Sequence, residues 1–258
     1  MRPFLTLAFL ALAAPALAED NPLLPSATWD DLRESVVGLT AEPPVDPAVF
    51  DLTAPIRAND AALVPIHITQ PAGGAAITDL TVVIDENPAP VAAEYSFGPA
   101  LMPLDFEVRM RVNAYSDVRG IATTEGGDTV MAGRFVKASG GCSAPAGKDM
   151  AAVAETMGQM RWKSVAEGGR TIGTLMIRHP NFSGLQRDQV TLLNIPAHFI
   201  DKLEVRQGEE LLFTMSAGIS VSEDPVFRFG YEPNGQPISV HVEDTEGQVW
   251  DQVFDAAG

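Results

Sequence analysis

The most reactive side chain type in this sequence occurs once, at Cys142. Gly140 and Gly141 precede it, and Ser143 begins a run of small residues after it. Because glycine leaves the backbone free to adopt many conformations, this pattern predicts a flexible arm that carries a thiol. The neighbouring residues show no apolar periodicity, so we expect an exposed thiol rather than a buried cysteine acting as a small hydrophobe.

A single cysteine cannot form an internal disulfide, so other roles must be considered for its thiol. The thiolate is a strong nucleophile, but catalysis needs a fixed geometry that a flexible arm does not provide. The pattern therefore favours a thiol that holds a group covalently and passes it between sites, and a disulfide-linked homodimer through Cys142 stays open. The histidines are not spaced as metal ligands and are expected to be structural: His67, His179, His198 and His241.

The first 18 residues are typical of a secretory signal peptide. Arg2 precedes an apolar run that ends in a small-residue cleavage pattern at Ala16-Leu17-Ala18. The run is shorter than the roughly 20 apolar residues that a membrane-spanning helix needs. We therefore expect an exported protein without a membrane anchor, located in the periplasm of a Gram-negative host.

Composition and charge exclude several classes of function. The formal net charge of −17 would repel nucleic acid and anionic lipid, and it suits a basic protein partner as well as simple solubility. None of the common nucleotide-binding, hydrolase, metalloprotease or redox motifs occurs in the sequence. We expect no catalytic, cofactor-binding or metal-binding residues, and we expect that the protein is not an enzyme.

Alternating apolar residues predict two blocks of β-strands with turns between them. In the first block, the alternation over 106–112 predicts that the even-numbered residues face the core and that Glu107, Arg109 and Arg111 face solvent. Helical spacing predicts a short helix at about 29–37, capped by Thr28. The expected strands are 61–70, 77–86, 90–98, 106–115, 116–124 and 128–138 in the first block, and 171–180, 199–207, 210–218, 225–233, 237–245 and 248–255 in the second.

Between the blocks, the composition of residues 147–160 predicts a helix, and residues 163–170 are typical of a linker. The expected fold class is therefore all-β, with two antiparallel β-sandwich domains joined by a helical linker. The expected boundaries are a signal peptide over 1–18, a first domain over 19–146, the helix and linker over 147–170, and a second domain over 171–258.

Several stretches resemble the sulfur-carrier pair of the thiosulfate-oxidising Sox system. The first block is similar to SoxY in "LTAPIRANDAALVPIHI", "VVIDENPAPVAAEYSF", "RMRVNAYSDVRGIA" and the "GGC" that ends at Cys142. The second block is similar to SoxZ in "IRHPNFSGLQRD", "IPAHFIDKLEV" and "SAGISVSEDPVFRFGY". The chain as a whole resembles the fused form known as the quinoprotein dehydrogenase-associated SoxYZ-like carrier.

The resemblance implies two immunoglobulin-like sandwiches packed on each other, and it implies that Cys142 matches the carrier cysteine. In SoxY that cysteine bears sulfur intermediates that periplasmic sulfur-oxidising enzymes load and unload, so a covalent sulfur adduct on Cys142 is expected. In SoxY the cysteine lies in a GGCGG-like chain end, whereas here Ser143 follows it and the chain continues. The alternative is a non-catalytic accessory or binding module for a periplasmic quinoprotein (alcohol) dehydrogenase or its cytochrome.

Overall fold

The computed structural model describes residues 21–145, 153, 155–189 and 191–256. The segment expected to be a signal peptide lies outside these ranges. No helix within them is long and apolar enough to cross a bilayer. The elements are α1 (Ala27–Ser35), β1 (Asp51–Thr53), β2 (Val64–Thr69), β3 (Ile77–Ile84), β4 (Val91–Phe97), η1 (Pro99–Leu101), β5 (Asp105–Met110), β6 (Ser116–Thr124), β7 (Thr129–Val136), η2 (Gly141–Ser143), β8 (Met160–Glu167), β9 (Arg170–Ile177), β10 (Ile200–Gln207), β11 (Glu210–Ala217), β12 (Val226–Tyr231), β13 (Ile238–Asp244) and β14 (Val249–Phe254).

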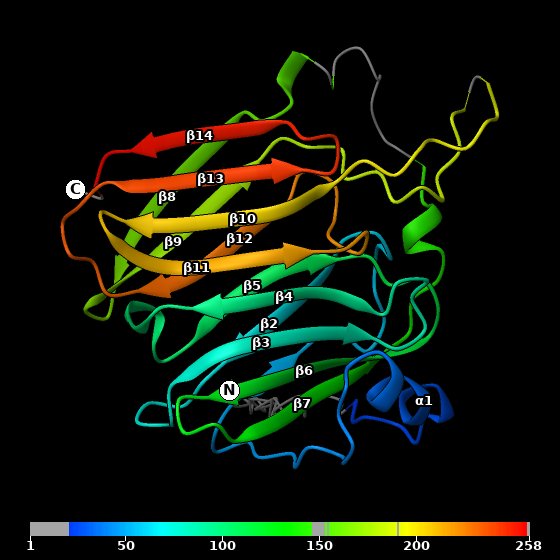
Figure 1. Cartoon of the computed structure of the whole chain (residues 1–258), viewed down its shortest axis with the longest axis horizontal. Coiled ribbons are helices and arrows are strands. Elements are labelled where there is room, and N and C mark those ends of the chain that lie inside the picture. The colour runs from blue at the N-terminus through cyan, green and yellow to red at the C-terminus, as the bar shows by residue number, and fades with distance from the viewer. Residues whose placement is uncertain (1–20, 146–152, 154, 190, 257–258) are drawn as a thin grey trace, which may run out of the picture.

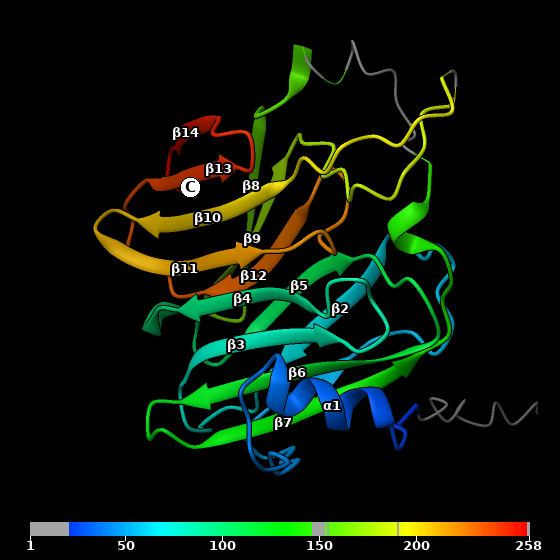
Figure 2. The same ribbon diagram turned by 45° about the vertical axis from the view of Figure 1, so that its right-hand side comes forward.

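The strands form two antiparallel sheets that both run through the two halves of the chain. One sheet has the order β1-β2-β5-β12-β9-β8, and the other has the order β14-β13-β10-β11-β4-β3-β6-β7. The halves meet where β5 pairs with β12 and where β4 pairs with β11 (Figures 1 and 2). The all-β, two-domain sandwich class is confirmed, and the two sandwiches share continuous sheets.

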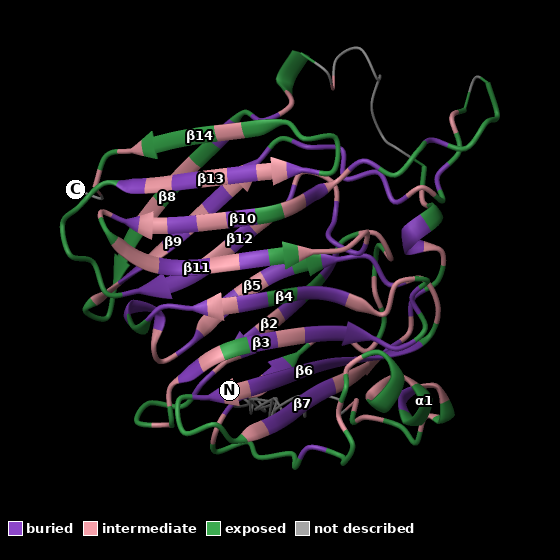
Figure 3. Cartoon of the chain, viewed as in Figure 1, coloured by how far each residue is buried: buried purple, intermediate pink, exposed green. Residues whose placement is uncertain are grey.

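The prediction that residues 163–170 form a linker is wrong. Residues 160–177 form the β8–β9 hairpin, which turns at Gly168 and Gly169 with positive φ angles of 60° and 89°. β8 is an edge strand with mostly exposed side chains, so its sequence lacks the apolar alternation that identified the other strands (Figure 3). Half of the helix predicted over 147–160 lies outside the described residues. Among the described positions, residues 153, 155 and 156 are helical, and Met160 is already part of β8.

Aromatic rings from both halves meet around Phe106 on β5. The Phe106 ring is 5.1 Å from Tyr95 in the first half and 5.2 Å from Phe213 in the second, measured between centroids. Phe227 of β12 lies 6.5 Å away, and all four rings belong to one continuous cluster of buried apolar side chains. Burial of large aromatic surfaces therefore holds the two halves together.

The inward-facing prediction for the even-numbered residues of 106–112 is confirmed, but the outward prediction for Arg111 is wrong. Arg109 is exposed, whereas Arg111 is 1% exposed. β5 ends at Met110, and beyond it the backbone N–H groups of Arg111 and Val112 donate to the carbonyls of Ser220 and Ala61. Because the chain is covered on both sides there, strand alternation no longer decides which side chain is buried.

Helix α1 begins two residues earlier than predicted, at Ala27. Its N-cap is Ser26, whose hydroxyl accepts the backbone N–H of Trp29, rather than Thr28. The buried Trp29 ring lies 4.5 Å from the guanidinium of Arg119, and it packs in a small second apolar cluster with Ile121. The helix thus covers the β6–β7 end of the larger sheet (Figure 1).

We predict that Phe106→Ala lowers the free energy of unfolding by about 3–5 kcal/mol, because it removes a ring from a closed core. Both halves should unfold in one transition, since this ring contacts each of them. Urea unfolding followed by circular dichroism and by tryptophan fluorescence measures both effects. Val253→Ala, on the exposed face of β14, is the control and should change stability little. Two separate transitions in the parent protein would contradict a shared core.

Candidate functional site

Cys142 lies six residues beyond the end of β7, in the short 3-10 turn η2. Gly140 caps this turn in the left-handed region, with φ of 77°, which a residue with a side chain adopts at a cost. A Cβ atom on Gly141 would lie 2.1 Å from the carbonyl oxygen of Ala61 and 2.6 Å from that of Val112. The glycines are therefore required for a tight backbone conformation and a close approach.

Backbone hydrogen bonds hold the turn against the first half. The Gly140 N–H donates to the Asn113 carbonyl at 2.7 Å, and the Gly141 N–H donates to the Val112 carbonyl at 3.2 Å. The Ser143 hydroxyl donates to the Gly140 carbonyl at 3.3 Å. The three residues predicted to form a flexible arm are thus placed in a hydrogen-bonded turn.

The second half closes over the same turn. The buried hydroxyl of Ser183 donates to the carbonyl of Cys142, and the Gln186 side-chain amide donates to the carbonyl of Ala144 at 2.9 Å. We call this pair of contacts from Ser183 and Gln186 the clamp. Because the clamp binds carbonyl oxygens, it places no requirement on the side chains of the turn.

The prediction of an exposed thiol is wrong, because Cys142 is 0% exposed. Removal from water disfavours the thiolate and raises the pKa of the thiol to about 11, against an opposing effect of the positive charge of Arg111. The thiol is therefore protonated and unreactive at neutral pH in this conformation. Cys142 is one of the buried apolar side chains, although it lies outside the two apolar clusters.

A cavity of about 570 Å³ lies beside the turn. Its walls include Arg109 and Arg111 from the first half, Ala144 and Pro145 beyond Cys142, and Gln186 of the clamp. The cavity thus lies next to the residues that follow Cys142, and its walls carry two guanidinium groups together with the carboxylates of Asp60, Glu223 and Asp224.

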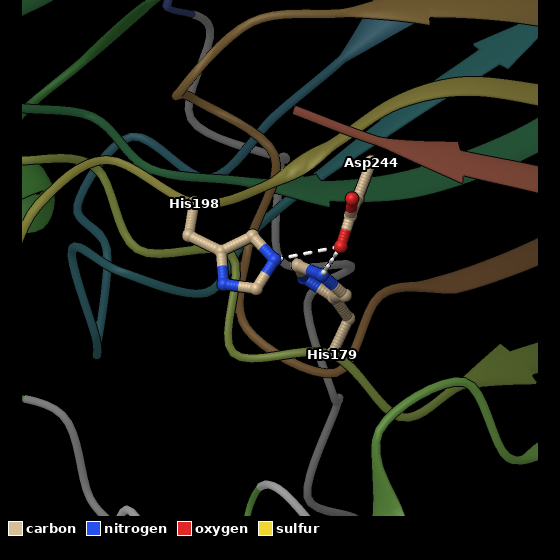
Figure 4. A group of neighbouring side chains, drawn as sticks. All are labelled: His179, His198 and Asp244. Carbon is tan, nitrogen blue, oxygen red and sulfur yellow. Dashed lines mark hydrogen bonds and ion pairs between the residues drawn. The ribbon is translucent and has the colours of Figure 1, made fainter. Parts of the chain in front are cut away.

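Two buried histidines and an aspartate anchor the segment that bears the clamp. His179 follows β9, His198 precedes β10, and Asp244 ends β13. The Nε2 atoms of His198 and His179 lie 2.6 Å and 3.5 Å from the same oxygen, Oδ2 of Asp244 (Figure 4). This cluster therefore connects the ends of three strands.

The three side chains are close enough for a metal ion to bridge them, but their hydrogen bonds do not fit one. The backbone N–H of Asn181 donates to Nδ1 of His179 at 3.1 Å. A neutral imidazole carries one proton, so that proton is on Nε2 and faces Asp244. A metal-binding histidine has the opposite arrangement, in which the nitrogen away from the metal donates its N–H. The cluster is therefore a hydrogen-bonded anchor.

Comparison with known families decides the identity of the two halves. A family model for sulfur oxidation protein SoxY matches residues 33–142, and one for sulphur oxidation protein SoxZ matches residues 160–255. The chain is a fused SoxYZ-like sulfur carrier. SoxY and SoxZ are carrier and accessory proteins rather than enzymes, and the same holds for this chain.

Other comparisons add little to this assignment. The solved structure of the sulfur carrier protein SoxY from Chlorobium limicola f thiosulfatophilum has 22% sequence identity and a TM-score of 0.34, and the match covers 43% of this chain and 96% of that chain. A likeness at this level carries no further conclusion. No curated protein matched the chain.

The family boundaries give the site a simple description. Cys142 is the last residue of the SoxY match, whereas the clamp and the histidine cluster lie in the SoxZ match. The SoxZ half thus closes the turn at the end of the SoxY half. Sequence reasoning missed Arg111, Ser183 and Gln186. The stretch "IRHPNFSGLQRD" contains two of the three, but no pattern in it indicates a contact with Cys142.

We predict that iodoacetamide alkylates Cys142 at least about a hundredfold more slowly in the folded protein than in urea at pH 8, because burial suppresses the thiolate. The rate in the folded protein should rise with pH toward about 11. The double variant Ser183→Ala, Gln186→Ala should react several-fold faster than the parent. Mass spectrometry of the alkylated product measures each rate.

The matched control for the clamp variant is Ser216→Ala, Gln252→Ala. It removes the same two side-chain types from exposed positions on β11 and β14, so it should alkylate at the parent rate. Equal rates for the clamp variant and this control would show that the clamp does not limit access to the thiol.

A further prediction concerns acid stability. Burial, together with the charge of His198, lowers the pKa of His179 to about 4. Between the unfolded pKa near 6.5 and this value, the unfolded chain binds more protons, so His179 makes the protein less stable as the pH falls. The loss at pH 4 should be up to about 3 kcal/mol. His179→Gln should flatten this part of the profile in urea unfolding at pH 7, 5.5 and 4.5.

His241→Gln serves as the control, because its neighbours Asp251 and Glu243 raise the pKa of His241. His241 therefore contributes stability that is present at acid pH and is lost as the pH rises through its folded pKa. Its removal should lower stability mainly at acid pH, in the opposite sense to His179→Gln. Parallel profiles for the parent and His179→Gln would refute the buried, neutral state of His179.

Proposed function

We propose that this SoxYZ-like protein holds sulfur-compound intermediates covalently on Cys142 and presents them to periplasmic sulfur-oxidising enzymes. The observation that supports the role of Cys142 most directly is its position. It is the only cysteine in the chain, it ends the SoxY match, and it lies next to a cavity lined by Arg109 and Arg111.

In the proposed cycle the clamp separates a closed state from an open one. In the closed state the thiol is buried and protonated, which protects it from adventitious oxidation. Release of the Ser183 and Gln186 contacts frees the carbonyls of the turn, and the left-handed Gly140 is a suitable hinge. A partner enzyme would load or unload the sulfur in the open state. A disulfide between two copies would need the same opening.

The proposed location is the periplasm. Residues 1–18 have the pattern of an export signal, and a sulfur carrier acts where its partner enzymes are. The net charge of −17 keeps such a protein soluble and favours basic partners.

A second candidate function follows from the burial of the thiol. A sealed and protonated Cys142 is also what a non-catalytic accessory module would contain, and the acidic surface suits a basic quinoprotein dehydrogenase or cytochrome. This function would not depend on the sulfur of Cys142. The two candidates therefore differ in the effect of removing that atom.

We predict that protein purified from its host during growth on a reduced sulfur compound carries an adduct on Cys142, seen as added mass that a reductant removes. Cys142→Ser should carry none. Because serine has nearly the same shape, the variant should keep the parent melting temperature, yet a strain with it should oxidise the sulfur compound no faster than a deletion strain. A bare thiol in every preparation, with a Cys142→Ser strain that behaves like the parent, would contradict the carrier function and favour the accessory one.

A further inference from the structure

Among the described residues, the two sheets end in four edge strands, and three of these edges are protected from pairing with another chain. β1 has only three residues, and β7 donates backbone N–H groups to the carbonyls of Asn21 and Pro44. β8 is exposed, but it carries Arg161, Lys163 and Glu167 on its exposed face. Short length, a covering segment and charged side chains are the usual means by which an edge strand avoids sheet extension.

The fourth edge, β14, lacks this protection. Its six residues include no proline, glycine or lysine, and in the described part of the chain only β13 forms hydrogen bonds with its backbone. Val249 and Val253 are 53% and 66% exposed. They share a face with Asp251, because side chains alternate along a strand. β14 forms the outer end of the larger sheet (Figures 1 and 3), so an extended segment can pair with it.

The ionisable groups on this face alternate from strand to strand. Asp251 of β14 lies opposite His241 of β13, and His241 lies opposite Glu204 of β10. Nδ1 of His241 is 2.8 Å from Oδ1 of Asp251, and its Nε2 atom is 3.2 Å from Oε1 of Glu243. These two carboxylates raise the pKa of His241. The next position in the row, on a strand added beyond Asp251, is therefore suited to a cation.

The other carboxylates of this face have further cations of their own. Glu243 lies 2.7 Å from Nζ of Lys202, and Glu204 lies 2.6 Å from Nε of Arg206. The side chain of Asp251 is 73% exposed, and His241 contacts only one of its two oxygens. Asp251 is thus the carboxylate of this face that is most accessible to a new partner.

A second copy of this chain fits the edge poorly. In an antiparallel pair of two β14 strands, the register that sets Val249 against Val253 also sets Asp251 against Asp251 of the other copy. Like charges directly opposite each other destabilise a strand pair. Two chains with a net charge of −17 also repel each other at longer range. The occupant that fits carries a cation between its apolar residues.

We propose that β14 is a docking edge for an extended segment of a basic partner protein, which adds a strand to the larger sheet. The segment has the pattern apolar-x-Lys/Arg-x-apolar, with apolar residues opposite Val249 and Val253 and the cation opposite Asp251. This pattern is the same in both chain directions, so it applies to parallel and antiparallel addition. No residue of β14 lines the cavity beside Cys142, so docking leaves that cavity open.

Three heptapeptides with blocked termini test the pattern. TVTKTVT places two valines and a lysine on one face of a strand. TVTETVT replaces the lysine with glutamate. TTVKVTT has the composition of the first peptide but places its valines and its lysine on opposite faces. Each peptide is titrated into the protein, and backbone amide shifts in NMR spectra report both the affinity and the place of binding.

In the parent protein we expect TVTKTVT to shift the amide signals of β14 and β13. It should bind about fivefold more tightly than TVTETVT, because an opposite-charge pair replaces a like-charge pair. TTVKVTT should also bind more weakly than TVTKTVT, because it cannot set its valines and its lysine against β14 together. Equal affinities for the three peptides, or shifts confined to other strands, would overturn the proposal.

Variants locate the binding on one edge. Val253→Lys protects β14 with a charge and should abolish binding of TVTKTVT. The matched control is Val165→Lys on β8, because Val165 is also 66% exposed on an edge strand, and it should bind as the parent does. Asp251→Lys should reverse the preference in favour of TVTETVT. Loss of binding in Val165→Lys but not in Val253→Lys would show that β14 is the wrong edge.

Circular dichroism checks the fold of each variant, and if one misfolds, the three peptides with the parent protein decide the proposal. Sedimentation velocity with a reductant present distinguishes the possible occupants of the edge. The parent should be a monomer. A dimer that Val253→Lys dissociates and Val165→Lys does not would assign β14 to a second copy and overturn the basic partner. Cys142→Ser should leave every affinity unchanged, so this proposal and the carrier function fail or stand separately.

Discussion

The site depends on the pairing of strands across the boundary between the two halves. β4 with β11 and β5 with β12 are joined in register, with Phe97 opposite Phe213 and Phe106 opposite Phe229. Backbone pairing of this kind fixes the relative position of the halves, and a shift by one residue would turn every core side chain outward. The segment that follows β9 is thereby held over the end of the SoxY half. Ser183 can reach the carbonyl of Cys142 only because this registration is fixed.

The clamp is made of weaker polar contacts than those that hold the buried charges of the first half. Its two hydrogen bonds are neutral and contribute together about 2 kcal/mol. The network of Arg119 with Asp85 and Asp117 is of another kind, because breaking it would leave buried charges unpaired. The protein therefore has its strong polar contacts within the first half and its weaker ones over the turn that bears Cys142.

The sequence was sufficient to predict the fold class and most of the strands, because apolar alternation is a local signal. It failed at β8, whose exposed edge position removes the alternation. It also failed at Arg111, where the strand ends and the backbone N–H bonds to the distant carbonyl of Ser220. The position of Cys142 was recognised from its glycines, but their role was misjudged. Gly141 is required by the carbonyl of Ala61, which is 80 residues earlier in the chain and leaves no trace in the local pattern. The clamp was missed for the same reason, since a hydroxyl that binds a carbonyl requires no complementary residue type.

Fusion of the two halves changes what the clamp can do. In one chain, the contact of Ser183 and Gln186 with the turn is intramolecular, so its effective concentration is fixed by the fold and cannot be diluted. The turn also continues into the chain on both sides of Cys142, so opening must move a loop rather than a free end. A loop reaches less far than a chain end of the same length. For the proposed carrier function, the arrangement therefore favours partners that approach the cavity over partners with deep active sites.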